Sequence, residues 1–317
     1  MAVFPIPGCT LPAFMIHRSI LFQTQKCQPV NMNLISDNGD ATFSTLVEIS
    51  DEELEEIGMI LGLHRCFDLS VYKAKCMKRR VAIRMRSTRC HDAAAYCNLL
   101  QRNDRELDLL QKTLTIHVSQ FFRNPSMFEK LGSDVLPALF KAREKETGSP
   151  LRFWCLGCAG GEEPYSLAIL LREHFGSELR HTRSVITGTD IDPDTLQGAL
   201  QAEYNEDRLK DVSTEIRERY FQRLGSRFAL IPEIREMVIF LQGDITDVGR
   251  YLASDVVFCR NTLIYFTRHD QEKILHGIAD CLTAGGVLVL GKSESLVGSV
   301  RPRFTAICPV ERIYRKV

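Results

Sequence analysis

The sequence has no apolar run that approaches the roughly 20 residues a helix needs to span a bilayer. It also has no excess of charge, since 40 Lys and Arg balance 40 Asp and Glu, so global charge favours no bulk attraction to nucleic acid or membrane. The first 22 residues lack a basic segment before their apolar stretch and contain three prolines, which argues against a secretory signal. We expect a cytoplasmic protein with no direct membrane insertion.

The 11 cysteines lack the regular spacing of a disulfide framework, and a chain of 317 residues does not need such staples. Cys155 and Cys158 have the C-x-x-C spacing of redox or zinc sites, but no second pair completes a zinc site. Small apolar packing explains the pair more simply. We predict reduced thiols and no metal.

The first half of the chain divides into two parts by composition. Residues 1–42 carry proline, glycine and asparagine without a hydrophobic period, and we expect a poorly ordered leader there. Residues 43–145 have helical spacing, with a capping-box pattern at Ser50 and Glu53 and a second, basic helix over residues 68–89. They predict a helical N-terminal domain.

Residues 146–317 alternate short apolar strands with helices, the pattern of a parallel sheet covered by helices on both faces. The predicted fold class is therefore α/β. The stretch from about 208 to 238 is longer than a simple crossover and predicts a small inserted subdomain, while residues 303–317 predict a closing hairpin. In such a sheet, ligands bind at the carboxyl ends of the strands.

The first strand ends in "GCAGGEEP", where Gly157 allows a tight turn and a close approach to a ligand. The dinucleotide pattern G-x-G-x-x-G is absent, and Glu162 and Glu163 would repel a pyrophosphate. They suit a cofactor with a positive centre, such as S-adenosylmethionine. The alternative, that they only complement a helix dipole, is equally favoured when this turn is considered alone.

Three further strand ends carry polar residues. Asp190 is placed to accept hydrogen bonds from ribose hydroxyls, whereas Asp192 fits better as a helix N-cap. Asp244 is placed to accept from an adenine amino group, and Arg260 and Asn261 end the fourth strand. The agreement of four strand ends predicts an adenosyl cofactor that brings positive charge and no phosphate.

Five segments occur in order along the chain: "TLTIHVSQFFRNPSMF", "GCAGGEEPYSLAILL", "TGTDIDPDTLQGA", "FCRNTLIYF" and "GGVLVLGKSESL". From about residue 48 to the end, the sequence resembles the CheR-type chemoreceptor glutamate methyltransferases. The resemblance implies a Rossmann-like S-adenosylmethionine-dependent methyltransferase domain with a small inserted β-subdomain, preceded by a helical domain. It also implies methyl transfer to glutamate side chains on the cytoplasmic helices of methyl-accepting chemoreceptors, with S-adenosylhomocysteine as the product.

Matched position by position, the resemblance also implies the site residues. Arg123 would orient the substrate carboxylate, and Tyr265 would lie near the transferred methyl group. Glu162 or Glu163 would contact the methionine part of the cofactor. The other implied cofactor contacts are His117, Ser119, Arg123, Asp190, Asp244, Ile245, Arg260 and Asn261, to which the first turn adds Gly157.

Three features depart from the family pattern. His117 stands where asparagine is common, and the 42-residue leader has no counterpart in minimal members. The segment after Phe221 is also too short for the glycine-flanked loop that docks a receptor's C-terminal pentapeptide. We therefore expect methylation that is independent of pentapeptide tethering.

Basic residues gather between Lys73 and Arg89, where eight Lys or Arg occur with no acidic residue. A solvated helix face would explain this run, but glutamate-rich receptor helices would also be attracted to it. Nucleic acid is less favoured, because Tyr72 is the only aromatic residue there that could stack on bases. The predicted docking residues are Lys73, Lys78, Arg79, Arg80, Arg84 and Arg86.

Two rival functions can be weighed against receptor methylation. A nucleic-acid methyltransferase would need an N/D-P-P-Y/F motif or a Pro-Cys pair after the fourth strand, where "CRNTLIYF" stands instead. A non-catalytic scaffold would have no need of a full set of site residues. Nothing in the sequence demands more than a monomer.

Overall fold

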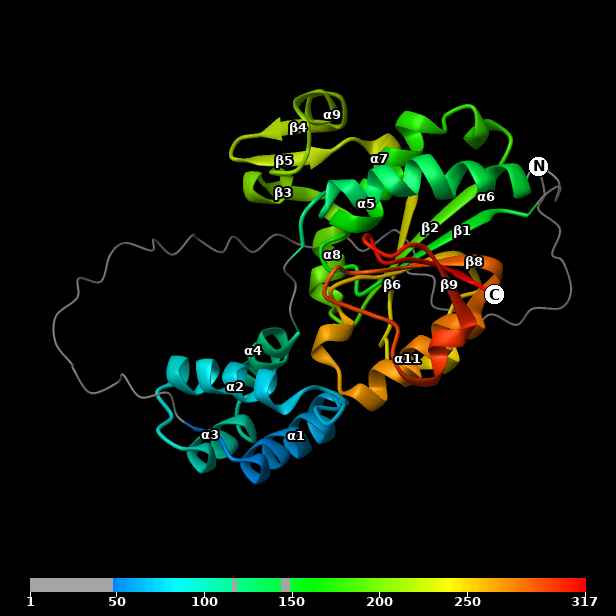
Figure 1. Ribbon diagram of the computed structural model, residues 1–317. Helices are drawn as coiled ribbons and strands as arrows, with labels where there is room; N and C mark the ends of the chain where they lie inside the picture. The colour runs from blue at the N-terminus through cyan, green and yellow to red at the C-terminus, as the bar shows by residue number, and fades with distance from the viewer. Residues whose placement is uncertain (1–47, 116–118, 144–148) are drawn as a thin grey trace, which may run out of the picture. The chain divides into compact units, whose positions relative to one another are not determined.

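The computed structural model describes residues 48–115, 119–143 and 149–317, so the leader expected at 1–42 and His117 lie outside the described residues. The described chain begins with a helical domain (Figure 1). The Ser50 side chain accepts a hydrogen bond from the Glu53 N–H, and the Glu53 carboxylate accepts one from the Ser50 N–H, so the capping box is confirmed. The helices are α1 (Asp51–Arg65), α2 (Ala74–Thr88), α3 (Ala93–Leu100) and α4 (Asp104–Leu114).

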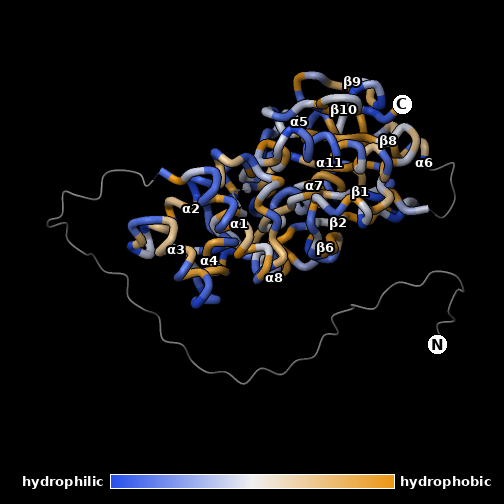
Figure 2. Tube along the Cα trace, turned by 90° about the horizontal axis from the view of Figure 1, so that it is seen from below, coloured by the Kyte–Doolittle hydropathy of each residue, from blue (hydrophilic) through white to orange (hydrophobic). Residues whose placement is uncertain are grey.

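The four helices share one apolar core. Ile57 and Leu61 of α1, Met77 and Val81 of α2 and Leu110 of α4 are fully buried in it. Figure 2 shows hydrophilic and hydrophobic residues alternating at short intervals along these helices, as expected of helices with one buried face. Among the described residues, no helix has both the length and the apolar character to cross a bilayer.

The basic helix starts later than the sequence predicts. α2 begins at Ala74 rather than near residue 68, because the preceding segment leaves the helical path. Tyr72 forms an isolated β-bridge with Phe266, and its ring stacks on Phe67 and Phe266 with centroid distances of 5.4 and 4.8 Å. Through these contacts the segment before α2 packs against Phe266, which belongs to the second domain of the chain.

A seven-stranded sheet with the order β6-β2-β1-β7-β8-β10-β9 forms the second domain. The closing hairpin, β9 (Phe304–Cys308) and β10 (Ile313–Lys316), supplies the antiparallel edge, as predicted. Because β1 lies between β2 and β7, the chain winds outward from β1 in both directions, which creates a switch point for ligand binding. The parallel strands are β1 (Leu151–Leu156), β2 (Ser184–Asp190), β6 (Val238–Gln242), β7 (Ser254–Cys259) and β8 (Leu282–Leu290).

Helices cover both faces of this sheet. Phe153 and Cys155 of β1 belong to the core shared with α5 (Pro125–Lys130), α6 (Leu136–Arg143) and α7 (Glu162–His174). Trp154 and Leu156 of the same strand belong to the core shared with α11 (Arg268–Cys281). Burial on both faces explains why β1 has an almost continuous apolar sequence.

The inserted subdomain follows α8 (Pro193–Gln201) and starts at Glu203, slightly before the predicted boundary near 208. Ala202 has a φ of 53° and turns the chain from α8 into the first strand of the insert. The insert has the strand order β3-β5-β4. Its elements are β3 (Glu203–Asn205), α9 (Thr214–Tyr220), β4 (Phe221–Leu224), β5 (Arg227–Leu230) and α10 (Pro232–Arg235).

Candidate active site

A cleft with about 1000 Å³ of empty space, part of it open to solvent, lies at the carboxyl ends of β1, β2, β6 and β7. Its lining comes from segments that are far apart in sequence: Tyr72, the end of α4, residues 119–123 and the turns that follow these strands. Parallel strands bring their carboxyl ends to one edge of the sheet, so the doubly wound topology places the polar strand ends together.

Most of the site residues predicted from the sequence lie in this cleft. Glu162 does not line it, because its carboxylate is buried and pairs with Arg208, with Oε1 and Nη1 3.3 Å apart. His117 lies within residues 116–118, outside the described part of the chain. The predicted residues that line the cleft are Ser119, Arg123, Gly157, Glu163, Asp190, Asp244, Ile245, Arg260, Asn261 and Tyr265.

Glycine is required at two positions of the turn between β1 and α7. Gly157 has a φ of +68°, and a Cβ atom there would lie 2.6 Å from Thr262 Oγ1. Gly161 has a φ of +85°, and its Cβ would lie 2.8 Å from Phe240 Cζ. The two glycines therefore allow the turn to pass close to the ends of β6 and β7.

Asp190 ends β2 and is almost fully buried, yet it lines the cleft. Its Oδ2 accepts a hydrogen bond from the Ala159 N–H at 2.9 Å, and its Oδ1 accepts one from the Asp192 N–H at 3.1 Å. The carboxylate thus ties the glycine turn to the start of α8. Asp192 caps α8 by accepting from the Asp194 N–H, as predicted.

Asp244 follows β6 and is exposed at the edge of the cleft. Its Oδ1 accepts hydrogen bonds from the N–H and the hydroxyl of Thr246, both at 2.8 Å. These contacts fix the side chain while leaving it accessible as an acceptor. Ile245 adds an apolar surface beside it, so the pair suits a flat base that carries an amino group.

Arg260 is buried at the end of β7 and connects two other segments. Its Nη1 lies 2.7 Å from Glu163 Oε2, and its Nη2 donates to the Arg123 carbonyl and to Asn124 Oδ1 at 2.8 and 2.9 Å. In the described structure its buried Nε has no acceptor. An acceptor group of a bound ligand would satisfy this donor.

The donors and acceptors of the cleft fit S-adenosylmethionine. Arg260 Nε can donate to the cofactor's carboxylate, and Asp190 can accept from its ribose hydroxyls. The described lining carries three carboxylates, of Glu163, Asp190 and Asp244, against two guanidiniums, of Arg123 and Arg260. Its charge is therefore balanced slightly towards the acidic side, which suits a cofactor with a cationic centre better than one with several phosphates.

Glu294, in the turn after β8, is a site residue that the argument from strand ends did not single out. Its buried carboxylate accepts hydrogen bonds from the N–H groups of Asn261 and Thr262, both at 2.8 Å, and of Gly291 at 2.7 Å. Burial raises the pKa of Glu294 above its ordinary value, and the backbone donors oppose part of that shift. Glu294 therefore fixes the turn that carries Arg260 and Asn261. Its only sequence signal is its place in the segment "GGVLVLGKSESL".

Non-glycine residues with left-handed backbone conformations surround the cleft. Phe122, Asn124, Ala159 and Asn261 have φ angles of 51°, 63°, 48° and 60°. Such a conformation costs about 1–3 kcal/mol and persists only where neighbouring contacts hold it. Asp190 holds Ala159, and Glu294 holds Asn261, through their N–H groups. The left-handed backbone at Ala159 and Asn261 is therefore held by hydrogen bonds to side chains from other segments of the fold.

Tyr265 lies beside the basic helix. Its carbonyl accepts from the Lys73 N–H at 2.8 Å, and Lys73 Nζ donates to the Ile264 carbonyl at 2.7 Å. The Arg80 guanidinium lies 5.8 Å from the centre of the Tyr265 ring. Burial raises the pKa of the Tyr265 hydroxyl, with Arg80 and Arg123 opposing this shift. The hydroxyl is therefore protonated, and able to donate, at neutral pH.

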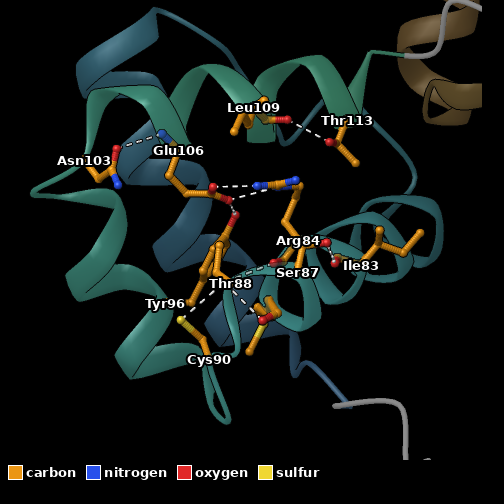
Figure 3. A network of polar contacts seen from close by, with 11 residues as sticks. Ile83, Arg84, Ser87, Thr88, Cys90, Tyr96, Asn103, Glu106, Leu109 and Thr113 are labelled. Carbon is orange, nitrogen blue, oxygen red and sulfur yellow. Dashed lines mark hydrogen bonds and ion pairs between the residues drawn. The ribbon is translucent and has the colours of Figure 1, made fainter. Parts of the chain in front are cut away.

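The predicted docking residues on α2 have different surroundings. Arg79 and Arg86 are exposed, whereas Arg84 binds Glu106 through Nε and Nη2 at 3.0 and 2.6 Å. The Tyr96 hydroxyl donates to the same carboxylate at 2.8 Å (Figure 3). Because Glu106 is only 4 % exposed, this pair belongs to the core of the helical domain.

The remaining basic residues have partners at the surface or at helix ends. Arg80 donates from Nη1 to the carbonyls of Thr113 and Leu114 at 2.7 and 2.9 Å, where α4 ends and its last carbonyls lack helical partners. Lys78 pairs with Asp51 at 2.9 Å. Arg80 thus attaches the basic helix to the part of α4 that lines the cleft.

The cleft also includes residues that were not predicted from the sequence, among them Tyr72, Thr115, Gln120 and Thr262. Tyr72 was considered only as an aromatic residue that could stack on bases. Its position at the cleft depends on the non-helical segment before α2, and the helical pattern of residues 68–89 concealed that segment.

The cysteine pair lies within the fold rather than in a metal centre. Among the described residues, no group of three or more His, Cys, Asp or Glu could hold a metal ion. Cys155 and Cys158 are buried free thiols, and burial raises the pKa of both well above the ordinary value. Protonated, buried thiols fit a packing role.

Comparison with known proteins identifies both domains. Residues 117–309 match the family described as "CheR methyltransferase, SAM binding domain", and residues 52–115 match "CheR methyltransferase, all-alpha domain". A chemotaxis protein methyltransferase of Listeria innocua is 32% identical over 230 residues, which cover 73% of this chain and 85% of that protein. An uncharacterized 104.1 kDa protein of Rhodobacter capsulatus is 34% identical over 264 residues, which cover 83% of this chain but only 27% of that protein.

Among solved structures, the glycopeptide N-methyltransferase MtfA in complex with S-adenosylhomocysteine aligns over 48% of this chain and 47% of that chain, with a TM-score of 0.28 and 13% identity. The family matches extend over both domains of the described chain, and the matched catalytic domain binds S-adenosylmethionine. The protein belongs to the CheR family of S-adenosylmethionine-dependent methyltransferases.

Proposed function

We propose that the protein transfers the methyl group of S-adenosylmethionine to glutamate side chains on the cytoplasmic helices of chemoreceptors, forming glutamate methyl esters for sensory adaptation. The observation that carries this proposal is the contact between the basic helix and the cleft. α2 borders Tyr265 through Lys73 and Arg80. A glutamate-bearing helix attracted to α2 would present its carboxylates at the edge of the cofactor cleft.

We assign cofactor binding to residues that follow the sheet strands. We expect Asp190 to bind the ribose, Asp244 and Ile245 the adenine, and Arg260 together with Glu163 the methionine part. Ser119, Gly157 and Asn261 line the same cleft. When bound, S-adenosylmethionine supplies an electrophilic methyl group on a sulfonium centre.

Arg123 and Tyr265 would position the substrate carboxylate. The planar guanidinium of Arg123 matches a carboxylate in a bidentate arrangement, and the protonated Tyr265 hydroxyl can donate a further hydrogen bond. A glutamate side chain is already ionised near neutral pH, so the site needs no general base. These residues act by holding the nucleophilic oxygen in line with the methyl group.

On α2 we assign receptor docking to Lys73, Lys78, Arg79, Arg80 and Arg86. Arg84 supports that surface from inside, through its pair with Glu106. The connection between β4 and β5 has only two residues, Gly225 and Ser226, which supports methylation without a pentapeptide tether. We further propose that the protein works in the cytoplasm as a monomer and does not act on nucleic acid.

Radiolabelled methyl transfer to soluble cytoplasmic fragments of chemoreceptors tests this function. Wild-type protein should label a fragment, and mild base should release the label as methanol, because methyl esters are base-labile. Arg123→Lys should reduce labelling at least 100-fold, since a lysine cannot bind the carboxylate in a bidentate way. Arg102→Lys, at an exposed position of the helical domain, is the matched control.

A receptor fragment with glutamine in place of the methylated glutamates should remain unlabelled. Base-stable label in the receptor, or transfer of label to DNA or RNA instead, would overturn the proposed substrate. Binding of S-adenosylhomocysteine without transfer to any of these acceptors would favour the scaffold alternative.

A further inference from the structure

Arg208 lies outside the cleft but contacts two segments that form its walls. It belongs to the short 3-10 helix Glu206–Leu209 near the start of the inserted subdomain. Its Nη1 lies 3.3 Å from Glu162 Oε1 and also donates to the Ser119 carbonyl. The carbonyl of Arg208 accepts from the Phe121 N–H at 2.9 Å. One residue thus binds the start of α7 and the segment before α5.

The ion pair with Glu162 offsets the burial of a charge. Glu162 is the first residue of α7, and its side chain is 3% exposed, against 31% for Arg208. A buried carboxylate loses more hydration free energy than the partial positive charge of a helix N-terminus returns. A guanidinium at this distance therefore helps to keep the start of α7 in place.

The inserted subdomain holds the same two walls through further contacts. The Tyr204 hydroxyl donates to the Gly160 carbonyl at 2.8 Å, and the Gln120 amide donates to the Asp211 carboxylate. Ser119, Gln120 and the neighbouring Ala159 and Glu163 line the cleft. The segment from Tyr204 to Asp211 therefore braces the cofactor cleft from outside.

We propose that Arg208 is a positioning residue for cofactor binding, through which the inserted subdomain sets the affinity of the cleft for S-adenosylmethionine. Arg208 does not line the cleft, so it acts through Glu162 and Ser119. The inference rests on the cofactor assignment but not on the proposed substrate.

Calorimetric titration of S-adenosylhomocysteine into the full chain, well below the melting temperature, tests this role. Arg208→Met keeps an unbranched side chain but removes the guanidinium and its charge, and its Kd should be at least tenfold higher than that of the wild type. Arg208→Lys keeps the charge, but its ammonium cannot bridge Glu162 and the Ser119 carbonyl as a planar group does, so its Kd should rise about threefold.

Arg223→Met is the matched control. Arg223 lies in the same insert, is exposed and donates from Nε to the Gly225 carbonyl at 3.2 Å, so its hydrogen bond lies outside the Tyr204–Asp211 segment that braces the cleft. Its Kd should stay within twofold of the wild-type value.

A role confined to stability would lower the melting temperature of Arg208→Met and leave the Kd of the folded protein unchanged, which would overturn the proposal. If Arg208→Met does not fold, Arg208→Lys decides, and an unchanged Kd in that variant would also overturn it. Failure of the wild-type chain itself to bind S-adenosylhomocysteine would instead contradict the cofactor assignment.

Discussion

Arg260 Nη1 lies 2.7 Å from Glu163 Oε2, and this ion pair joins the end of β7 to the first turn of α7. The Arg260 side chain is 2% exposed and that of Glu163 is 14% exposed. The sequence suggests that each contacts the cofactor directly, yet in the structure they first bind each other. The pair therefore helps to set the position of the Arg260 Nε, a buried donor that has no acceptor in the described structure.

Glu163→Ala should lower both stability and cofactor affinity. Removing one partner of a buried ion pair costs about 3 kcal/mol, because it leaves an uncompensated charge. We expect a loss of that size in the free energy of unfolding by denaturant, and a Kd for S-adenosylhomocysteine at least tenfold higher. Asp134→Ala breaks the surface pair with Lys130 and should change neither quantity. A Glu163→Ala protein as stable as the wild type would contradict this reading of the pair.

Asp190→Ala should weaken S-adenosylhomocysteine binding at least fivefold, about 1 kcal/mol, because it removes the acceptor expected for the ribose and the acceptor for the Ala159 N–H. Calorimetry measures the change. Asp192→Ala is the control: it removes the N-cap of α8 and should cost about 1 kcal/mol of stability with little change in Kd. Equal Kd values for the two variants would count against a specific role of Asp190.

Variants at Arg84 and Arg86 should distinguish a residue that stabilises the core of the helical domain from one that docks the receptor. Arg84→Met leaves the buried Glu106 without its guanidinium and should lose about 3 kcal/mol of stability, seen as a lower denaturation midpoint. Arg86→Met should keep wild-type stability but raise the KM for a receptor fragment several-fold, with a smaller dependence on salt. An unchanged KM in Arg86→Met would argue against docking through α2, and a fully stable Arg84→Met would contradict the core role of the pair with Glu106.

Glu294 should make stability depend on pH in a defined direction. Burial raises its pKa above the ordinary 4.5, so between 4.5 and the folded-state pKa the native chain holds a proton that the unfolded chain has released. The stability that Glu294 contributes is therefore present below pH 4.5 and is lost as the pH rises through the folded-state pKa.

Denaturant titrations of wild type and Glu294→Gln between pH 4.5 and 7 check this dependence. The unfolding free energy of the wild type, relative to the variant, should fall with rising pH by at most about 1.4 kcal/mol per pH unit within that window. A relative stability that rises with pH would show that the three backbone donors outweigh the effect of burial.

The parts of the site that could be predicted are those that follow from topology. Parallel strands place their carboxyl ends together, so residues that directly follow a strand, such as Asp190 and Arg260, could be assigned to one cleft from the sequence. The choice between Glu162 and Glu163 could not be made in that way. Neighbouring helix residues point about 100° apart, so the rotation of α7 decides which of them faces the cleft.

Contacts between segments that are far apart along the chain could also not be predicted from the sequence pattern. Arg208 comes from an insert with its own small sheet, and nothing in its surroundings along the chain points to Glu162. Glu294 is a single acid in a turn, and its role depends on three N–H groups brought to it by the fold. The position of Tyr72 at the cleft could not be predicted, because the residues before α2 share the helical pattern of the basic helix that follows.

Tyr72 pairs with Phe266 through a β-bridge and also lines the cleft, so neither domain forms the cleft alone. An exchange of helical domains between related proteins would therefore replace one wall of the cleft together with the basic surface of α2. Such a recombination would change the receptor preference and the cofactor affinity at the same time. Further substitutions would then have to restore the cofactor affinity while keeping the new receptor preference.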